Sequence, residues 1–401
     1  MFLHDRIDPN DRFRERRRQA LRRRRIRQAL AVLVVVGVAA AIAGGATFFT
    51  SRGSSSTRAV APQVSTRPKP APSPFRTQPP QEIRGVHVTE GLASLPGKLE
   101  SYLTLTSQGL NTIELDVKDE NGYVGFVSSA LPALARSTGA ARPYYDAKKF
   151  IAEAHKAGVY VIGRVVVFED PTLTSAEPQM GIQSKWGGVW KTSSNLGWAN
   201  EYDRRVWKYN ADVGAAAAKA GFDEIQFDYV RFPTDGDISS MVFPHKRAEP
   251  RSTTIYDFIS YAASRLHPLR VRVSADVFGL SASRDLGIGQ SPKRIGKVLD
   301  AIYPMVYPSH YNPGEYDLLE PEAFPYATVV HSLRDFNKQT RGEKVHIVPW
   351  LQDFTIKYSY GLEQVGEQID AARTMHVKGF LLWNPNGEYT SNALLHRSPS
   401  P

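Results

Sequence analysis

Acidic side chains stand where several strand-like apolar runs of this sequence end. Residues 222–233 read FDEIQFDYVRFP, and the buried-strand pattern of this run breaks at Asp228. Asp276 ends a second apolar run, and Asp116 lies near the end of a third. Two carboxyl groups in one site can cleave a glycosidic bond, because one protonates the leaving oxygen while the other attacks the anomeric carbon or activates water.

Polar and aromatic side chains mark the ends of other strand-like runs, where a purely structural strand would not need them. We predict that the following side chains contact a ligand: Arg231, Tyr307, His310, Trp350, Gln352, Trp383 and Asn384. The long connection 169–202 also carries Trp186, Trp190 and Trp198. Long connections in compact domains are usually functional, and aromatic faces suit the apolar faces of sugar rings. The alternative is that these tryptophans only pack the connection onto the domain.

Strand-like and helix-like segments alternate from residue 83 onward, and they predict the elements that position these side chains. The predicted strands are residues 83–88, 111–117, 159–168, 224–230, 271–275, 301–306, 345–349 and 378–383. The predicted helices are residues 95–108, 146–157, 203–220, 253–266, 292–299, 326–339 and 362–376. Eight strands in sustained β/α alternation predict an α/β fold of the (β/α)8 TIM-barrel type, in which functional groups lie at the carboxyl ends of the strands.

Basic residues are concentrated in the N-terminal part of the chain. The chain has 401 residues and a net charge of +10. Residues 1–82 contain 16 lysines and arginines against 5 acids, which leaves 34 against 35 for residues 83–401. The predicted barrel therefore lacks the excess positive charge typical of nucleic-acid-binding domains, and we predict no nucleic-acid partner.

The N-terminal region predicts a membrane anchor followed by a spacer. An arginine-rich tail, residues 1–28, precedes residues 29–49, an uncharged apolar run long enough to cross a bilayer. The position of the arginines predicts a cytoplasmic N-terminus and an extracellular C-terminal domain, with a cleaved signal peptide as the alternative. Residues 50–82 are rich in Pro, Ser and Thr and predict a disordered linker. The barrel is expected over residues 83–390, followed by a short tail at 391–401.

Sequence patterns for several other chemistries are missing. The 10 histidines are scattered with no HxxxH or HExxH pattern, so we predict no metal site and no cofactor. The chain also has no GxSxG elbow, no P-loop and no GxGxxG turn after its first predicted strand. It has no cysteine and therefore no disulfide. Carboxyl groups remain the main candidates for chemistry.

Six motifs, in their order along the chain, resemble a known family. They are NTIELDVKDEN at residues 111–121, GFDEIQFDYVRFP at 221–233, ADVFG at 275–279, PMVYPSHY at 304–311, PWLQDF at 349–354 and LWNPNGEY at 382–389. Together they resemble the bacterial putative glycosyl hydrolase domain family, over about residues 83–390. The resemblance implies a TIM barrel related to glycoside hydrolases and a polysaccharide or oligosaccharide substrate. At Glu201 the family pattern leads us to expect a proline instead.

The resemblance also implies roles for the acids. In related barrels an acid at the end of the fourth strand is commonly the nucleophile or the stabilising carboxylate, which implies this role, or that of the base, for Asp228. Asp276, at the end of the fifth strand, is then the general acid. The assignment could be reversed, or shared with Asp116 or Glu114, because the sequence does not give the distances between the carboxyl groups.

A barrel that only binds polysaccharide is the alternative function. Such a protein would act as a scaffold in the cell envelope, and Asp228 would then form an ion pair with Arg164 or Arg231. The aromatic side chains would serve either function. Convergent acids at Asp228 and Asp276 would serve only an enzyme.

Overall fold

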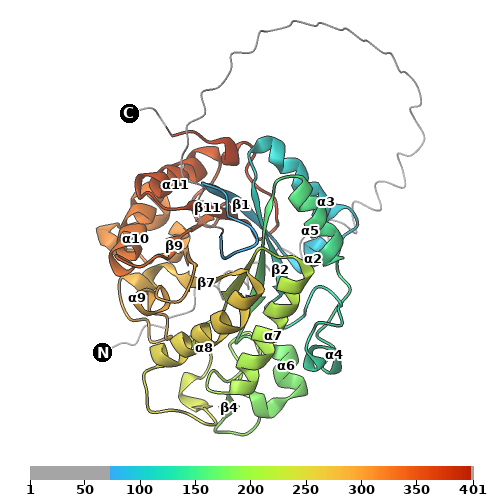
Figure 1. Cartoon of the computed structure of the whole chain (residues 1–401). Coiled ribbons are helices and arrows are strands. Elements are labelled where there is room, and N and C mark those ends of the chain that lie inside the picture. The colour runs from blue at the N-terminus through green and yellow to red at the C-terminus, as the bar shows by residue number, and fades with distance from the viewer. Residues whose placement is uncertain (1–72, 399–401) are drawn as a thin grey trace, which may run out of the picture. The chain divides into compact units, whose positions relative to one another are not determined.

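The structure, a computed structural model, describes residues 73–398. Parallel strands form a closed barrel in this part of the chain, with helices on the outside (Figure 1). The predicted tail and membrane span, and most of the predicted linker, lie outside the described residues. Within residues 73–398, no helix is both long and apolar enough to cross a bilayer.

One parallel sheet of nine strands fills the eight strand positions of a TIM barrel, because the short strands β9 and β10 together form the seventh position. The nine strands are β1 (Ile83–Val88), β2 (Thr112–Lys118), β3 (Tyr160–Val166), β5 (Glu224–Asp228), β7 (Arg272–Phe278), β8 (Ala301–Met305), β9 (His346–Ile347), β10 (Trp350–Gln352) and β11 (Gly379–Trp383). They pair in the order β10-β11-β1-β2-β3-β5-β7-β8-β9, and the pairing of β10 with β8 closes the ring. The predicted eight-stranded parallel barrel is confirmed.

The seventh strand position is interrupted in its middle by Pro349, which has no N–H to donate to the sheet. β9 ends before this proline and β10 begins after it. The Pro349 carbonyl still accepts a hydrogen bond from Leu381 N (3.0 Å), which keeps β11 in register. The sequence predicted one strand at residues 345–349, so this prediction missed the segment that carries Trp350.

Helices follow the strands and cover the outside of the barrel (Figure 1). The longer ones are α5 (Ala147–Lys156), α7 (Arg204–Ala220), α8 (Arg251–Leu266), α10 (Pro325–Gln339) and α11 (Leu362–Thr374). The shorter ones are α2 (Glu90–Ala93), α3 (Lys98–Ser101), α4 (Ala133–Ser137), α6 (Pro171–Ala176) and α9 (Pro292–Ile295). Asp146 and Asp203 cap α5 and α7, because their side chains accept hydrogen bonds from the N–H groups of Lys149 and Arg205.

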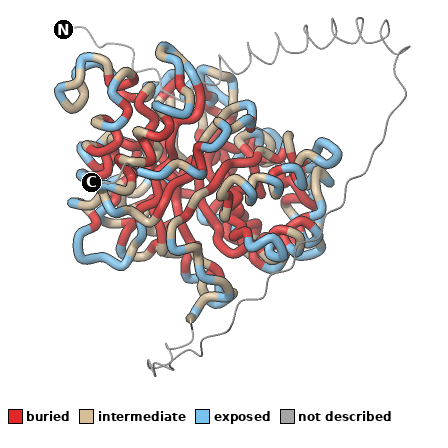
Figure 2. The backbone as a smooth tube through the Cα atoms, turned by 90° about the horizontal axis from the view of Figure 1, so that it is seen from above, coloured by how far each residue is buried: buried red, intermediate tan, exposed pale blue. Residues whose placement is uncertain are grey.

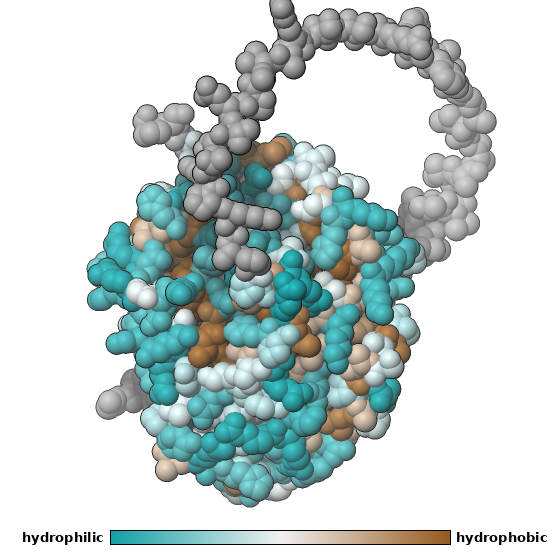
Figure 3. All heavy atoms as spheres, in the orientation of Figure 1, coloured by the Kyte–Doolittle hydropathy of each residue, from teal (hydrophilic) through white to brown (hydrophobic). Residues whose placement is uncertain are grey.

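Alternate residues of each strand face opposite sides of the barrel wall. In β2, Ile113, Leu115 and Val117 belong to the apolar core between strands and helices, whereas Glu114 and Asp116 do not. Figure 2 shows that the buried residues fill the centre of the domain and that the exposed ones lie mainly at its periphery. On the face shown in Figure 3, hydrophilic side chains predominate and hydrophobic areas are scattered. In β2 the side chains on the inner side of the barrel thus include the two acids.

Residues 74–82 contact the amino-terminal end of the barrel, although the sequence assigned them to the linker. The Arg76 guanidinium donates to Ala218 O (2.7 Å). From the start of β7, Arg272 donates to Gln78 Oε1 (2.9 Å). The chain therefore enters the barrel at the end opposite to the carboxyl ends of the strands.

Removal of residues 73–82 is expected to lower the free energy of unfolding by roughly 2–4 kcal/mol, because several hydrogen bonds of about 1 kcal/mol each are lost. The measurement is urea unfolding of the chains 73–401 and 83–401 in parallel. Arg76→Ala in the longer chain is the single-site comparison, with an expected loss of about 1 kcal/mol. Equal unfolding free energies for the two chains would contradict a structural role for this segment.

Candidate active site

Asp228 ends β5 and lies among hydrogen-bond donors. Arg164 Nε and Nη2 donate to its Oδ2 atom at 3.0 and 2.6 Å, and the Tyr229 N–H donates to Oδ1 at 2.6 Å. Tyr229 has a φ of 49°, a left-handed conformation that is unusual for an aromatic residue and costs free energy. The side chain of Asp228 remains 11% exposed, so its carboxylate is still accessible from the strand ends.

Asp276 lies on β7, the neighbour of β5 in the barrel. Its Oδ1 atom accepts hydrogen bonds from Gln226 Nε2 and Trp350 Nε1, both at 2.6 Å. Its buried Oδ2 atom has no hydrogen-bond partner among the described residues. Burial, and then repulsion by Asp228 and Glu114, raise the pKa of Asp276 well above its usual value. Because Oδ1 already accepts two hydrogen bonds, a proton on this carboxyl group resides on Oδ2.

Arg164, on β3, is the buried cation that joins the acids. Its Nη1 atom donates to Asp116 Oδ1 (2.6 Å) and its Nε atom lies 3.8 Å from Glu114 Oε1, while the same guanidinium holds Asp228. Burial outweighs the attraction of Arg164 and raises the pKa of Asp116 to about 6. Burial likewise raises the pKa of Glu114 well above its usual value. One guanidinium thus forms ion pairs with four carboxyl groups, since its Nη1 atom also lies 3.9 Å from Glu120 Oε2.

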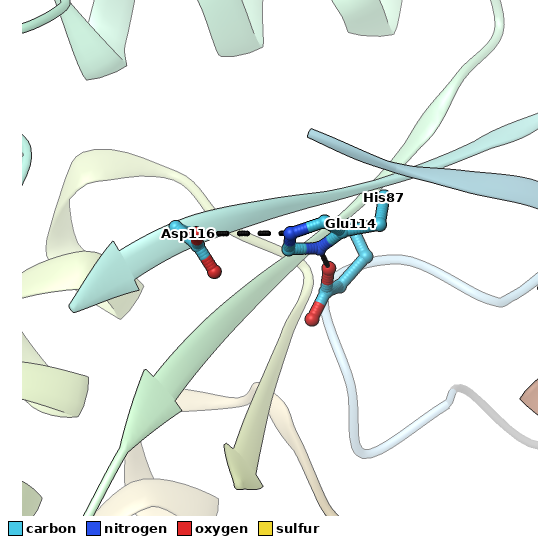
Figure 4. A group of neighbouring side chains, drawn as sticks. All are labelled: His87, Glu114 and Asp116. Carbon is cyan, nitrogen blue, oxygen red and sulfur yellow. Dashed lines mark hydrogen bonds and ion pairs between the residues drawn. The ribbon is translucent and has the colours of Figure 1, made fainter. Parts of the chain in front are cut away.

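Figure 4 shows His87 between Glu114 and Asp116. Its Nδ1 atom contacts Glu114 Oε2, and its Nε2 atom lies 3.7 Å from Asp116 Oδ2. The three side chains are close enough to be considered as metal ligands. However, the two ring nitrogens face different carboxyl groups, and the positive charge of Arg164 on Asp116 would repel a cation. A hydrogen-bonded charge cluster fits this geometry better than a metal site, and the absence of a metal stays a prediction.

Aromatic side chains border the acids on the side of β8, β10 and β11. The Trp383 ring lies 4.3 Å from the His87 ring and 5.9 Å from the Trp350 ring, between centroids. Tyr307, which follows β8, is buried, and burial and the negative charges of the site acids raise its pKa. The structure thus brings together the following predicted site residues: Asp116, Asp228, Asp276, Tyr307, Trp350 and Trp383.

Arg231 lies in a cage of aromatic rings beside the acids. Its guanidinium carbon is 5.0 Å from the ring centroid of Trp198, 5.2 Å from that of Tyr229 and 4.8 Å from that of Phe278. Tyr229 follows β5 and Phe278 ends β7, so the cage connects the two strands that carry Asp228 and Asp276. Both Arg231 and Trp198 are buried in this position. Their predicted contact with a sugar stays a prediction.

The three tryptophans of the connection 169–202 lie in different environments. Trp198 is buried and its Nε1 donates to Glu201 Oε1 (2.8 Å). Trp190 is buried and its Nε1 donates to a backbone carbonyl at 2.8 Å. Trp186 is 78% exposed. Glu201, where we expected a proline, is fully buried, and burial raises its pKa to about 8.

Gln352, Asn384 and His310 make contacts within the protein. Gln352 is fully buried, with its Nε2 donating to a backbone carbonyl (2.9 Å) and its Oε1 accepting from a backbone N–H (3.0 Å). The Asn384 side chain donates to the carbonyl of Asp353. His310 is half-buried and packs on the Tyr307 ring, 5.0 Å away between centroids. These contacts position the loops around the acids, and ligand binding by these three residues stays a prediction.

Gln226 and His87 are site residues that the sequence analysis did not select. Gln226 lies on the same face of β5 as Glu224 and Asp228, because alternate residues of a strand point to one side. This alternation is visible in the sequence and could have identified Gln226. His87 carries no such signal, since its valine neighbours in β1 are typical of a core strand.

Comparisons with known proteins place this geometry in context. The chain matches the model of a family described as "Putative glycosyl hydrolase domain" over residues 85–389. A hypothetical protein from Ruminiclostridium thermocellum is 34% identical over 48% of this chain and 97% of its own, with a TM-score of 0.44. No curated protein matches the chain.

Two further solved structures are similar in fold. The glycoside hydrolase domain of PgaB (BpsB) from Bordetella bronchiseptica has a TM-score of 0.55 at 14% identity, over 76% of this chain and 94% of that chain. The catalytic domain of a β-amylase from Paenibacillus polymyxa has a TM-score of 0.51 at 12% identity, over 80% of this chain and 98% of that chain. At these identities both similarities show the barrel fold alone.

Proposed function

Since the chain belongs to the putative glycosyl hydrolase domain family, we propose that it is a glycoside hydrolase that cleaves a polysaccharide or oligosaccharide by carboxylate acid/base catalysis. One observation carries the proposal, the contrast between two neighbouring carboxyl groups. Asp276 has a raised pKa and a free Oδ2 atom, whereas Asp228 accepts two charge-assisted hydrogen bonds from Arg164. Glycosidic cleavage needs one carboxyl group that donates a proton and a second one that attacks the anomeric carbon or activates water.

The proposed mechanism follows from the partners of each oxygen atom. Asp276 transfers the proton on Oδ2 to the glycosidic oxygen as the bond between this oxygen and the anomeric carbon breaks. Asp228 attacks the anomeric carbon, or removes a proton from the water that does so. Gln226 and Trp350 hold Asp276 through Oδ1 alone, which leaves Oδ2 for the transfer. The proposal requires no metal and no cofactor.

The proposal includes attachment to the cell membrane through residues 29–49, with the barrel outside the cell. This part of the proposal rests on the sequence alone, in which an uncharged apolar run follows an arginine-rich segment. The proposed sugar contacts are the aromatic side chains near the acids, above all Tyr307 and Trp383. Trp383 supports this role because it is only half-buried at the end of β11.

A non-catalytic barrel that binds polysaccharide is the second candidate function. One observation favours it: both oxygens of Asp228 already accept hydrogen bonds from the protein, as in a structural ion pair. The unpartnered Oδ2 of Asp276 favours the enzyme, because a purely structural acid would be expected to bond both of its buried oxygens.

Release of reducing ends from a panel of polysaccharides tests the proposal. The full chain, kept in detergent and treated with EDTA, is expected to release reducing ends, because carboxyl groups alone perform the chemistry. The double variant Asp228→Asn/Asp276→Asn is the control for contaminating hydrolases. Binding of a polysaccharide by the wild type without release of reducing ends would favour the scaffold.

A further inference from the structure

Two short strands form a separate sheet at the margin of the domain. β4 (Gln183–Ser184) pairs antiparallel with β6 (Met241–Val242), and Figure 1 shows β4 at the edge of the domain, beside α6. β4 lies in the connection that follows β3, and β6 in the connection that follows β5. Both connections therefore start at the carboxyl ends of barrel strands, where the acids also lie. We call residues 183–189, which carry Trp186 at their tip, the Trp186 hairpin.

The Trp186 hairpin has a well-supported backbone. Lys185 N donates to Ser240 O (2.8 Å), which continues the pairing of β4 with β6. Beneath the tip, the buried indole of Trp190 donates to Asp237 O (2.8 Å). The two glycines that follow Trp186 have φ values of 98° and 73°, in the left-handed region that such a tight turn requires and that glycine adopts without strain.

The indole of Trp186 is held in position but is not covered. Its side chain is 78% exposed, and Lys185 Nζ lies 4.7 Å from the ring centroid. Hydrogen bonds from Ser239 and then from Trp186 lower the pKa of Asp237, so this carboxylate lies beside the indole. Single exposed apolar side chains are common on protein surfaces. An exposed indole on a supported hairpin, with a cation and a carboxylate as neighbours, has the properties of a ligand platform.

The chemistry of the Trp186 hairpin favours a sugar over a protein partner. Ile238 and Val242 are the neighbouring exposed apolar side chains, at 39% and 46% exposure. A stable protein interface buries about 800 Å² on each partner, far more than these few side chains present. A sugar ring offers an apolar C–H face surrounded by hydroxyl groups, which matches an indole flanked by hydrogen-bonding groups.

We propose that the Trp186 hairpin is a second carbohydrate-binding platform, separate from the acids, that holds a remote sugar unit of a polymeric substrate. The inference rests on the proposed function and narrows it, because a platform at the margin of the domain benefits only a substrate of many units. We therefore expect that a short oligosaccharide bound at the acids does not contact it.

Kinetics of the full chain in detergent on two substrates test the inference: a trisaccharide, and the polymer from which it derives. Trp186→Ala is expected to lower kcat/KM on the polymer by about 3- to 10-fold through a higher KM, the usual range for one aromatic contact. Its kcat/KM on the trisaccharide should equal that of the wild type, and Trp186→Phe should retain part of the polymer activity. Leu319→Ala, which removes another exposed apolar side chain (82%), is the matched control and should change neither value.

A polymer-binding experiment distinguishes failure of this inference from failure of the proposed function. Polymer embedded in a native gel should retard the wild type, and Trp186→Ala should migrate as if the polymer were absent. If no hydrolysis occurs but this difference is seen, the platform stands and the hydrolase proposal falls. Equal retardation of both proteins, no retardation of the wild type by any polymer, or equal loss of activity on both substrates would overturn the platform. A change in the sedimentation coefficient caused by Trp186→Ala would also overturn it, in favour of a contact between two copies of the chain.

Discussion

Asp276→Asn is expected to lower kcat on a natural glycan by about 10²- to 10⁴-fold, the usual contribution of a general acid. The asparagine Oδ1 can still accept the hydrogen bonds of Gln226 and Trp350, so we expect the barrel to remain folded. The variant has no proton to give to the leaving oxygen. The measurement is steady-state kinetics on the polymer that the wild type cleaves, with circular dichroism to verify the fold.

Leaving groups of different basicity separate the roles of the two acids. A nitrophenolate departs without protonation, so Asp276→Asn should retain most of its activity on a nitrophenyl glycoside. Asp228→Asn should lose activity on both substrates, because attack at the anomeric carbon fails in each case. The opposite pattern would reverse the assignment, and wild-type activity of Asp276→Asn on the glycan would refute its role as the acid.

The pH dependence of kcat tests independently whether Asp276 is the general acid. Burial and repulsion by Asp228 and Glu114 raise the pKa of Asp276, and the acid must be protonated to act. The kcat of the wild type should therefore decrease as the pH rises through this pKa. The residual activity of Asp276→Asn should lack this decrease, because asparagine does not titrate.

Arg164→Met is expected to lower the free energy of unfolding by about 3–5 kcal/mol, the usual cost of breaking a buried ion pair. The variant leaves Asp116, Glu114 and Asp228 in the barrel without their shared guanidinium. Methionine has a similar length and no charge, so lost packing contributes little. The measurement is denaturant unfolding followed by circular dichroism at two pH values.

The loss of stability in Arg164→Met should be larger at pH 8 than at pH 5. Arg164 lowers the pKa of Glu114, Asp116 and Asp276, against the larger effect of burial. Without Arg164 these pKa values rise further above those of the unfolded chain, which are about 4. The folded state then retains protons that the unfolded state releases, so stability decreases as the pH rises from about 4 toward the folded-state values.

Arg265→Met is the matched control for Arg164→Met, because it removes an arginine from an exposed ion pair. Arg265 lies 2.8 Å from Asp212, and its side chain is 47% exposed. Exposed pairs contribute about 0–1 kcal/mol, so this variant should be nearly as stable as the wild type. If Arg164→Met also lowered the free energy of unfolding at pH 8 by only about 0–1 kcal/mol, the guanidinium would not be stabilising the site acids in the folded state.

The order of elements could be predicted from the sequence because each barrel strand carries its own apolar pattern. The predicted helix at 203–220 corresponds to α7, and the predicted strand at 224–230 to β5, within two residues at each end. The predictions at 95–108 and 292–299 were less accurate, because only Lys98–Ser101 and Pro292–Ile295 are α-helical there. The seventh strand also differs, because Pro349 divides the run. Proline has no N–H to donate to the sheet, so the sequence pattern suggested that the strand ends at Pro349. The segment with Trp350 is identified as a strand only by its pairing with β11.

The sequence alone determined the strand ends that carry acids, because a charged residue at the end of a buried apolar run is a local feature. It also determined the concentration of positive charge in the first 82 residues and the family motifs. The tertiary structure decided which groups meet: Arg164 with four acids, and Trp350 with Asp276. It also placed Trp198 in the core but Trp186 in solvent. These outcomes depend on strand register and loop packing across long sequence separations, which no single segment encodes.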